Sequence, residues 1–376
     1  MNLLIENNSD KNLRFVSGSM GYGCNAVNGY MVDDGYLYVD VAAGKKANNT
    51  ISFSIEELTI YGITDIADIQ VGFEISDGDY NSIYSGPRQI KTSAADSYDY
   101  TTDTYIKSIN SGIVEAVYDC SIDYFAEDEL YNQDGIRIVS EALMTNSEGE
   151  KVLFFEIENN SSEQVFGAAA DISVNGLTIC DGTWTRDYIN QGTRRVMALS
   201  LSSMMDEEYW EVFGITNIGQ VTCLFSIEDT DHNKLMTPQE INIAIPGTDA
   251  SLDSSGTELY NDNGIRLILK GMVEDSSKYS DDIHMLLLVE NNNSKVSGID
   301  DVRDSLSING FMTDCIVYSA TIFAGRCAVV DVEMEDSSLE KNGITGIDDI
   351  TEVEITFEIT DEDYKTIAEP KLSIQY

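Results

Sequence analysis

The sequence of 376 residues contains few basic residues and no long hydrophobic run, and each shortage excludes a class of function. Against 66 Asp and Glu there are 22 Lys and Arg, so the formal net charge is −44. Nucleic acids and anionic membrane leaflets are bound through clustered Lys and Arg, so we expect neither as a partner. No apolar run approaches the roughly 18 residues of a membrane-spanning helix, which argues against direct membrane insertion.

Cysteine and histidine are too few or too scattered for the common metal and nucleophilic sites. The six cysteines contain no CxxC pair, which argues against a disulfide framework or a zinc site. A Ser-His-Asp or histidine-rich site would have to use His232 or His284. His284 lies in the apolar segment IHMLLLVE and is interpreted as a packed or edge strand residue, and His232 as a turn residue. We therefore assign no catalytic, cofactor-binding or metal-binding residue, expect no cofactor, and predict that the protein is not an enzyme.

The sequence instead contains segments that recur three times in the same order. Each copy has an apolar run ending in Glu-Asn-Asn, an Asn-Gly pair, a later glycine, a Gly-Ile-Thr tripeptide, and a strand-like run with a closing proline. The Asn-Gly pairs begin at Asn28, Asn175 and Asn309. The later glycines are Gly44, Gly192 and Gly325, and the tripeptides begin at Gly62, Gly214 and Gly343. The prolines are Pro87, Pro238 and Pro370.

These segments predict an all-β protein of tandem immunoglobulin-like β-sandwiches, each with one short helix before the penultimate strand. Asn-Gly between apolar runs is typical of a type I′ hairpin, which needs positive φ at both central residues. After it, alternating residues from Tyr36 to Val41 indicate a half-buried strand that ends at a second hairpin tip at Gly44. Capping-box spacing at Ser54 and Ser337 marks the helix starts. The glycine of each Gly-Ile-Thr then supplies the αL residue that ends the helix.

The repeats divide the chain into three domains and two connections. We place domains at 1–93, 130–248 and 258–376, with a connector at 94–129 and a linker at 249–257. Domains 2 and 3 begin with an opening strand, LYNQDGIRIV or LYNDNGIRLI, that domain 1 lacks. Domain 1 should therefore have an open sheet edge. Two apolar runs around Asn-Ser-Gly predict a hairpin at 104–118 in the connector, which could pack on that edge. The alternative, which we favour, is that the N-terminus is truncated and the upstream part has been lost.

The repeats resemble those of uncharacterised secreted or lipid-anchored proteins of Gram-positive anaerobic bacteria. The resemblance rests on the ENNS strand end, the VNGYM segment, the VAAGKK turn and the GI..I..I..FEI.D pattern, and it covers nearly the whole chain. It implies an immunoglobulin-like fold and an extracellular or cell-envelope location, with no agreed activity. The segment MNLLIENNSD has neither the basic region nor the apolar core of a signal peptide, which departs from that family.

Several other patterns have a functional and a structural interpretation, and we favour the structural one for each. Acidic turns at 77–81, 229–233 and 361–365 resemble calcium loops, with Glu240 at the twelfth position in the second, but Asx turns give the same composition. The glycines at 21–26 match a relaxed dinucleotide fingerprint without its strand and helix. Trp184, Trp210 and Cys223 are expected in the core. The basic tips Lys45-Lys46, Arg194-Arg195 and Arg326 are expected to be solvated.

Taken together, these features predict a non-catalytic extracellular or cell-envelope display or adhesion module that binds an unidentified protein or glycan. One alternative is a carbohydrate-binding or enzyme-accessory array, for which Trp184 and the tyrosines near 98 to 105 are the candidate aromatics. A second is a hydrolase with paired carboxylates, which is disfavoured because the Asp clusters fall at turns. A third is a groove at the open edge of domain 1 that accepts a partner's strand.

Overall fold

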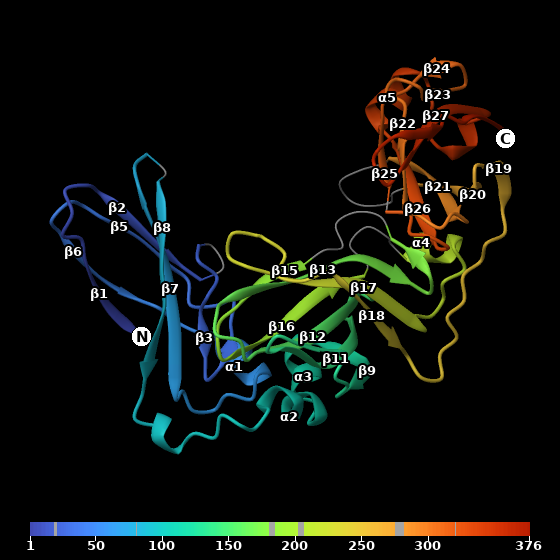
Figure 1. Cartoon of the computed structure of the whole chain (residues 1–376). Coiled ribbons are helices and arrows are strands. Elements are labelled where there is room, and N and C mark those ends of the chain that lie inside the picture. Colours follow the sequence, from blue (N-terminus) through green and yellow to red (C-terminus); the bar gives the residue numbers. More distant parts are fainter. Residues whose placement is uncertain (19–20, 80, 180–184, 202–206, 275–281, 320) are drawn as a thin grey trace. The chain divides into compact units, whose positions relative to one another are not determined.

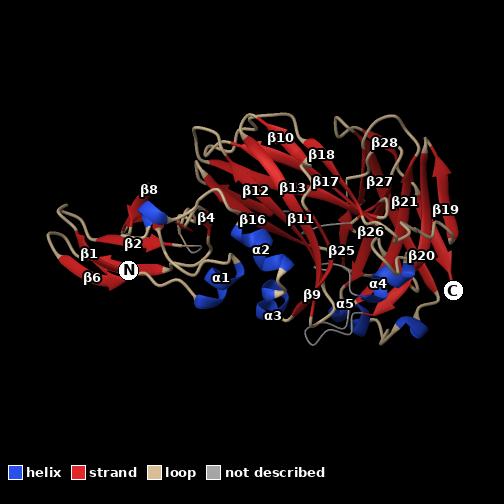
Figure 2. Cartoon of the chain, turned by 90° about the horizontal axis from the view of Figure 1, so that it is seen from below, coloured by secondary structure: helices blue, strands red, loops and turns tan. Residues whose placement is uncertain are grey.

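The computed structural model describes residues 1–18, 21–79, 81–179, 185–201, 207–274, 282–319 and 321–376. Within these residues the protein is all-β, and its strands form four sheets with a few short helices between them (Figures 1 and 2). The chain divides into two compact units, one of residues 1–168, 185–200 and 225–239, the other of 169–184, 201–224 and 240–376. The boundary passes through β13 (Val165–Val174) and β17 (Gln220–Glu228) of the second repeat. None of the described helices is long and apolar enough to cross a membrane.

Unit 1 contains the first repeat, the connector and part of the second repeat. A small sheet pairs β1 (Asn2–Glu6) with β6 (Lys46–Thr50). The larger sheet has the order β10-β11-β12-β16-β4-β3-β7-β2-β5, with β8 paired to β7 and β9 to β11. Its strands are β2 (Leu13–Ser17), β3 (Ala26–Val27), β4 (Tyr30–Met31), β5 (Leu37–Val41), β7 (Asp68–Asp77), β8 (Ser82–Lys91), β9 (Cys120–Ala126), β10 (Tyr131–Gln133), β11 (Ile136–Asn146), β12 (Lys151–Asn159) and β16 (Thr193–Ser200). The unit also contains β15 (Thr185–Ile189), α1 (Ile55–Ile60), η1 (Ala95–Ser97), α2 (Thr104–Asn110) and α3 (Ile113–Tyr118).

Unit 2 contains the rest of the second repeat and the whole third repeat. One sheet has the order β18-β17-β13-β14-β26-β21-β20-β19, with β25 on β26, and a smaller one has β22-β27-β23-β24, with β28 and β29 on β27. The strands are β14 (Leu177–Thr178), β18 (Gln239–Ala244), β19 (Thr257–Asp262), β20 (Ile265–Glu274), β21 (Ile283–Asn291), β22 (Ser297–Asp301), β23 (Ser307–Ile308), β24 (Phe311–Met312), β25 (Cys315–Ser319), β26 (Cys327–Met334), β27 (Glu352–Asp361), β28 (Thr366–Ala368) and β29 (Lys371–Gln375). The helices are α4 (Glu207–Val212), α5 (Asp336–Lys341) and η2 (Ile347–Asp349).

The Asn-Gly turns and the helix ends form as the sequence predicts. Each Asn-Gly pair has positive φ at both residues and joins β3 to β4, β13 to β14 or β23 to β24. The glycine after each short helix also has positive φ, which is the αL conformation that ends a helix. Ser54 caps α1, because its side chain accepts a hydrogen bond from the Glu57 amide. The prediction of a second capping box is wrong, since Ser337 lies inside α5 and the N-cap residue is Glu335.

Two strand predictions need correction. The opening segments of the second and third repeats are hairpins, β10–β11 and β19–β20, rather than single strands. Their turns, Asp134-Gly135 and Asn263-Gly264, have positive φ at both residues, so they repeat the same turn chemistry. The Gly44 tip is not a hairpin, because β5 pairs with β2 while β6 pairs with β1 in the other sheet. In the third repeat the corresponding strands β25 and β26 do pair.

The prediction of a hairpin at 104–118 in the connector is wrong, because the structure has the two helices α2 and α3 there. Residues Tyr105, Ser108 and Ile109 have helical spacing, and all three are buried on one face of α2. Asp103 caps that helix by accepting from the Ile106 amide. The turn that resembles a hairpin loop contains Gly112 in the αL conformation between the two helices. A short apolar run fits both periods, and burial of the helical face decides the outcome.

The connector helices join the first and second repeats through one hydrophobic core. Figure 2 shows α1, α2 and α3 beside one another, and they are in mutual contact. Their core contains residues from the first repeat, the connector and β11: Val27, Tyr30, Val32, Ile60, Tyr61, Ile63, Tyr105, Ile109, Val114, Ala142 and Met144. The helices therefore pack on α1, not on the edge of β1 where the hairpin is expected. Among the described residues, β1 pairs with β6 alone.

Candidate functional site

A strand junction connects the first repeat to the second within unit 1. β4, which follows the Asn28-Gly29 turn, pairs in parallel with β16 so that Tyr30 lies opposite Arg194. The Arg194 amide donates to the Gly29 carbonyl at 2.7 Å. Tyr30 stacks on Tyr61 with ring centroids 5.1 Å apart, and its hydroxyl accepts from the Thr104 amide at 2.8 Å. Backbone pairing and aromatic packing therefore fix this end of the second repeat against the first.

Arg194 at this junction lies among three carboxylates that are largely buried. Arg194 pairs with Asp103 and lies 2.6 Å from Glu158 and 3.6 Å from Glu156. Burial raises the pKa of Glu156 well above its ordinary value, and the Asp103 carboxylate raises it further, while Arg194 opposes both. Arg194 contacts all three of these carboxylates, and the Glu156 side chain is fully buried.

The adjacent Arg195 forms an ion pair across the junction. Its guanidinium lies 2.7 Å from Asp33 of the first repeat and 2.7 Å from Asp187 of the second. Arg195 is only 6% exposed. The expectation of a solvated basic tip is therefore wrong for Arg194 and Arg195, because the tip packs on the preceding repeat. An acidic sequence with basic pairs at equivalent positions is the feature that could have indicated this.

A second strand junction, in unit 2, connects the second repeat to the third. β14, which follows the Asn175-Gly176 turn, pairs in parallel with β26, placing Leu177 opposite Cys327. The Arg326 guanidinium pairs with Glu240 and lies 3.4 Å from the Thr222 hydroxyl. Glu240, at the twelfth position of the calcium-like pattern, is therefore an ion-pair partner, and the expectation of a solvated tip is wrong for Arg326 as well.

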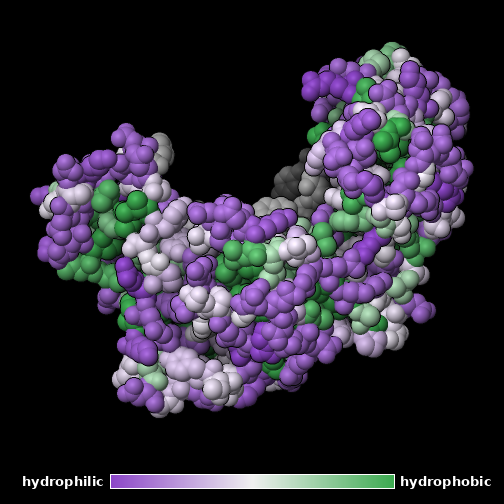
Figure 3. All heavy atoms as spheres, in the orientation of Figure 1, coloured by the Kyte–Doolittle hydropathy of each residue, from purple (hydrophilic) through white to green (hydrophobic). Residues whose placement is uncertain are grey.

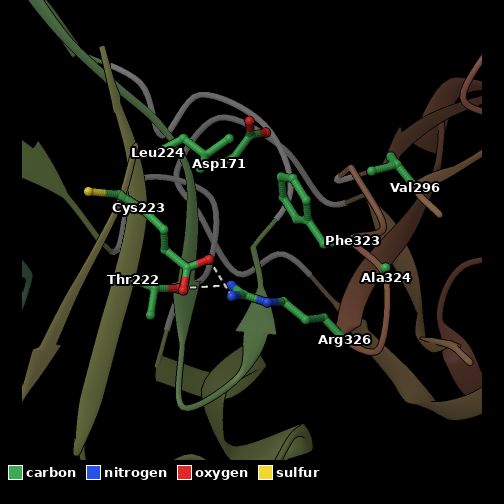
Figure 4. Close-up of a pocket in the computed structure, with 9 residues that line it drawn as sticks. Asp171, Thr222, Cys223, Leu224, Val296, Phe323, Ala324 and Arg326 are labelled. Atoms are coloured by element: carbon green, nitrogen blue, oxygen red, sulfur yellow. Dashed lines mark hydrogen bonds and ion pairs between the residues drawn. The ribbon is translucent and has the colours of Figure 1, made fainter. Parts of the chain in front are cut away.

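A cleft of about 240 Å³ opens beside this second junction (Figure 4). Figure 4 shows Arg326 reaching across to the strand that carries Thr222, with Phe323 and Val296 on the third-repeat side. The cleft is lined by Asp171, Thr222, Cys223, Leu224, Glu240, Val296, Phe323, Ala324 and Arg326. Cys223 is 2% exposed, as expected for a core residue, and burial raises the pKa of its thiol to about 12. The cysteine is therefore not a nucleophile at neutral pH.

A smaller pocket of about 130 Å³ lies next to the first junction, in unit 1. Tyr98 and Tyr100 form one side as an edge-to-face pair with ring centroids 4.7 Å apart. Polar groups of Asn28, Thr102, Glu158, Asn160, Thr193 and Arg194 line the remainder. Tyr100 is 44% exposed. The combination of an exposed aromatic with amide, carboxylate and guanidinium groups is suited to a polar ligand with apolar faces.

The two histidines occupy the kinds of position that the sequence predicts. His284 is buried in β21, an interior strand between β20 and β26, and its Nδ1 lies 3.0 Å from each carboxylate oxygen of Asp331. The ring also lies against Tyr209, with centroids 5.4 Å apart. His232 is exposed in a turn with positive φ, and its amide donates to the Asp229 carbonyl. The favoured interpretations of both histidines are confirmed.

The acidic turns are Asx turns in all three repeats. Asp229 Oδ1 accepts from the amides of Asp231 at 2.9 Å and Asn233 at 2.8 Å. Asp77 and Asp361 make the same pair of bonds in their own turns. Hydrogen bonds to their carboxylates lower the pKa of all three, with Lys11 as the main cause at Asp77. Across the described residues, no three His, Cys, Asp or Glu side chains are grouped to hold a metal ion.

The remaining candidates do not form a site. Trp210 is buried in α4, as expected for core packing, whereas Trp184 lies outside the described residues. The fingerprint at 21–26 leads into β3 rather than into a helix. A groove of about 500 Å³ lies on the β1–β6 pair and is lined by Asn2, Leu3, Leu4, Asn48, Asn49 and Thr50. Leu4 there is 58% exposed, so a partner strand at this edge would find one apolar anchor.

Comparison with known proteins gives no family. No family model and no curated protein matches the sequence. Solved structures similar to the chain include a protein of unknown function from Porphyromonas gingivalis W83, at 9% identity and a TM-score of 0.17, covering 61% of this chain and 92% of that one. Another is a 1.5-MDa bacterial ice-binding adhesin, at 9% identity and a TM-score of 0.15, covering 100% of this chain and 90% of that one. A third is the BSP domain of a biofilm-associated protein, at 10% identity and a TM-score of 0.16, covering 100% of this chain and 63% of that one. Scores this low support no inference about function.

Proposed function

We propose that this protein is a non-catalytic extracellular or cell-envelope module whose three repeats, at 1–93, 130–248 and 258–376, hold ligand-binding loops for display or adhesion. The observation that carries the proposal is the strand junction, which occurs twice with the same construction. Within each unit, backbone pairing and ion pairs link neighbouring repeats. A scaffold of this kind keeps its loops at fixed spacing, which is what multivalent attachment to a surface requires. The resemblance to secreted or lipid-anchored repeat proteins of Gram-positive anaerobes agrees with the proposed extracellular or cell-envelope location.

Adhesion without chemistry can be tested by attaching the chain to beads and measuring two quantities on the same ligands. Beads carrying the protein are passed over immobilised polysaccharides and extracellular matrix proteins under flow, and soluble products are assayed in the effluent. We expect retention on at least one surface with no product release above that of bare beads. Released oligosaccharide or peptide would make the protein a hydrolase, and an absence of retention on every surface would remove the proposed adhesion.

The tyrosine-lined pocket favours a glycan as a second candidate ligand. Sugars stack their apolar faces on aromatic rings while their hydroxyls bond to amides and charged groups, and the pocket offers both. Tyr100→Ala should abolish any retardation of the protein in gels containing the bound polysaccharide. Tyr36→Ala is the matched control, because Tyr36 is 50% exposed but lies outside the pocket. Equal retardation of both variants would exclude this pocket as the glycan site.

The open side of β1 is a separate proposal for a protein partner. β1 has one strand neighbour among the described residues, so its other side is unpaired, and Leu4 of this strand is 58% exposed. A synthetic peptide of residues 257–274, the opening hairpin of the third repeat, supplies the element that β1 lacks. We expect the peptide to raise the melting temperature of the protein, and a scrambled peptide to leave it unchanged. Binding of both peptides, or of neither, would contradict a specific strand-accepting edge.

A further inference from the structure

The two strand junctions follow one rule of register. We call the short strand after the Asn-Gly turn the accepting half of a junction. Its paired residue directly follows the glycine of Asn-Gly: Tyr30 after Gly29, and Leu177 after Gly176. We call the strand after the tip glycine of the next repeat the donating half. Its paired residue is the second one after that glycine: Arg194 after Gly192, and Cys327 after Gly325. Both pairings are parallel. The same positions in the remaining repeats therefore identify unused halves of the junction.

A side chain on the neighbouring strand also contacts the incoming tip at both junctions. In the first, Gln70 accepts from the Asn190 amide group at 2.8 Å. In the second, Thr222 accepts from Arg326 at 3.4 Å. Gln70 lies opposite Ala26 in β3, and Glu354 lies opposite Ser307 in β23, so Glu354 is the equivalent residue of the third repeat. Glu354 is exposed.

The third repeat presents the accepting half of a junction without an incoming strand. Tyr30 and Met31 are 3% and 0% exposed, and Leu177 and Thr178 are 0% and 1% exposed. Phe311 and Met312, at the equivalent positions of β24, are 53% and 60% exposed. Among the described residues, β24 pairs only with β23 (Figure 1). Figure 3 shows hydrophobic residues in several patches among hydrophilic ones on the face drawn. Two adjacent exposed apolar side chains at a position that is covered in both other repeats indicate a docking surface.

The first repeat presents the donating half. β6 begins two residues after Gly44, and its only strand partner among the described residues is β1. Lys46 corresponds to Arg194, and its bond to Glu6 repeats the bond of Arg194 to Glu158. Lys45 corresponds to Arg326, the residue that contacts the neighbouring strand at the second junction. Both halves of the interface are therefore present in one chain, on different repeats.

We propose that β24 of one molecule pairs in parallel with β6 of a second copy, with Phe311 opposite Lys46 and the Lys45 ammonium against the Glu354 carboxylate. The charges are complementary, since a basic tip from an acidic protein meets an exposed acid at the position that contacts the tip in the internal junctions. The two surfaces differ, so the contact is heterologous and joins molecules head to tail into rings or open filaments. Because the two halves belong to separate molecules, the association depends on protein concentration, unlike the internal junctions. It is independent of the ligand in the proposed function.

Charge reversal tests the pairing of Lys45 with Glu354. Neither single variant can form this pair with its own copies, but a mixture of the two variants can. Lys45→Glu places two acids together, and Glu354→Lys places two bases together, so each should weaken self-association by more than about tenfold. In an equimolar mixture, the glutamate introduced in one variant meets the lysine introduced in the other. The native Lys45 and Glu354 that remain in the two variants also meet, so the association should return. Sedimentation velocity over about a hundredfold range of concentration measures the mass distribution, and circular dichroism confirms that each variant is folded.

Matched controls separate this interface from nonspecific attraction. The double variant Lys45→Glu/Glu340→Lys, which gains a lysine at an exposed acid on α5, should remain as weakly associated as Lys45→Glu alone. Phe311→Ser and Met312→Ser should weaken association, whereas Ile316→Ser, at a residue 42% exposed on β25, should not. A wild-type chain that stays monomeric at every concentration overturns the proposal. So does association that persists in either charge-reversed variant alone, or a mixture that fails to restore it.

Discussion

Glu141 makes the stability of unit 1 depend on pH in a direction that the structure determines. The residue is 2% exposed on β11, and one of its carboxylate oxygens has no hydrogen-bond partner. Burial, followed by the Asp128 charge, raises its pKa from 4.5 to about 7, although the Tyr124 hydroxyl lies 3.4 Å from the other oxygen. Between pH 4.5 and 7 the unfolded chain loses this proton while the folded chain keeps it. This contribution to stability is therefore present below pH 4.5 and is lost as pH rises through 7.

The magnitude follows from the difference between the two pKa values. At about 1.4 kcal/mol per pH unit, ionisation of Glu141 costs the folded state at most about 3 kcal/mol above pH 7. Glu141→Gln removes the charge and keeps the shape, so the variant should melt higher than the wild type at about pH 8.5 and match it near pH 4.5. Differential scanning calorimetry across this range measures the difference between the two proteins, in which the contributions of the other acids cancel.

Glu148→Gln is the matched control, since Glu148 is an exposed acid in the turn after β11. It should leave the difference between acid and alkaline stability as it is in the wild type. Melting curves of Glu141→Gln and wild type that shift in parallel at every pH would refute the reasoning, because they would mean that Glu141 is ionised equally in both states.

Two other substitutions test the first junction and the connector. Arg195→Ala should destabilise unit 1 by about 1–3 kcal/mol in calorimetry, because it leaves the largely buried Asp187 without its partner. Arg14→Ala, at the exposed pair with Asp40, should cost about 1 kcal/mol or less. Equal losses would show that the ion pair of Arg195 with Asp187 does not stabilise unit 1. Ile109→Ala should cost about 2–4 kcal/mol because Ile109 lies in the shared core, and Ile113→Ala, at a residue 38% exposed, should stay within about 0.5 kcal/mol. An unchanged melting temperature for Ile109→Ala would mean that α2 does not contribute to the core.

Features set by neighbouring residues could be predicted from the sequence, and features set by distant pairing could not. The Asn28-Gly29 turn and the αL glycine Gly62 depend on local backbone conformation, so the residue types alone indicate them. The connector prediction fails because a short apolar run fits both periods, and the choice depends on burial against Tyr61 and Met144 in the shared core. The prediction at the Gly44 tip fails because a turn does not reveal whether the strands it joins enter the same sheet.

The strand junctions could not be predicted from the sequence, although the repeated residues that form them are visible in it. Each Asn-Gly turn is followed by a strand of only two residues, and in the first and second repeats this strand has a second neighbour. Arg194 and Arg326 recur at the tips that supply this neighbour, yet a basic residue in a turn is ordinarily solvated. The short strands of the first two repeats are buried by the strands that pair with them, whereas Phe311 and Met312 of the third are exposed. This difference is the basis for the proposed pairing of β24 with a second copy. The repetition that identified the modules therefore also identifies which of their edges remains to be paired.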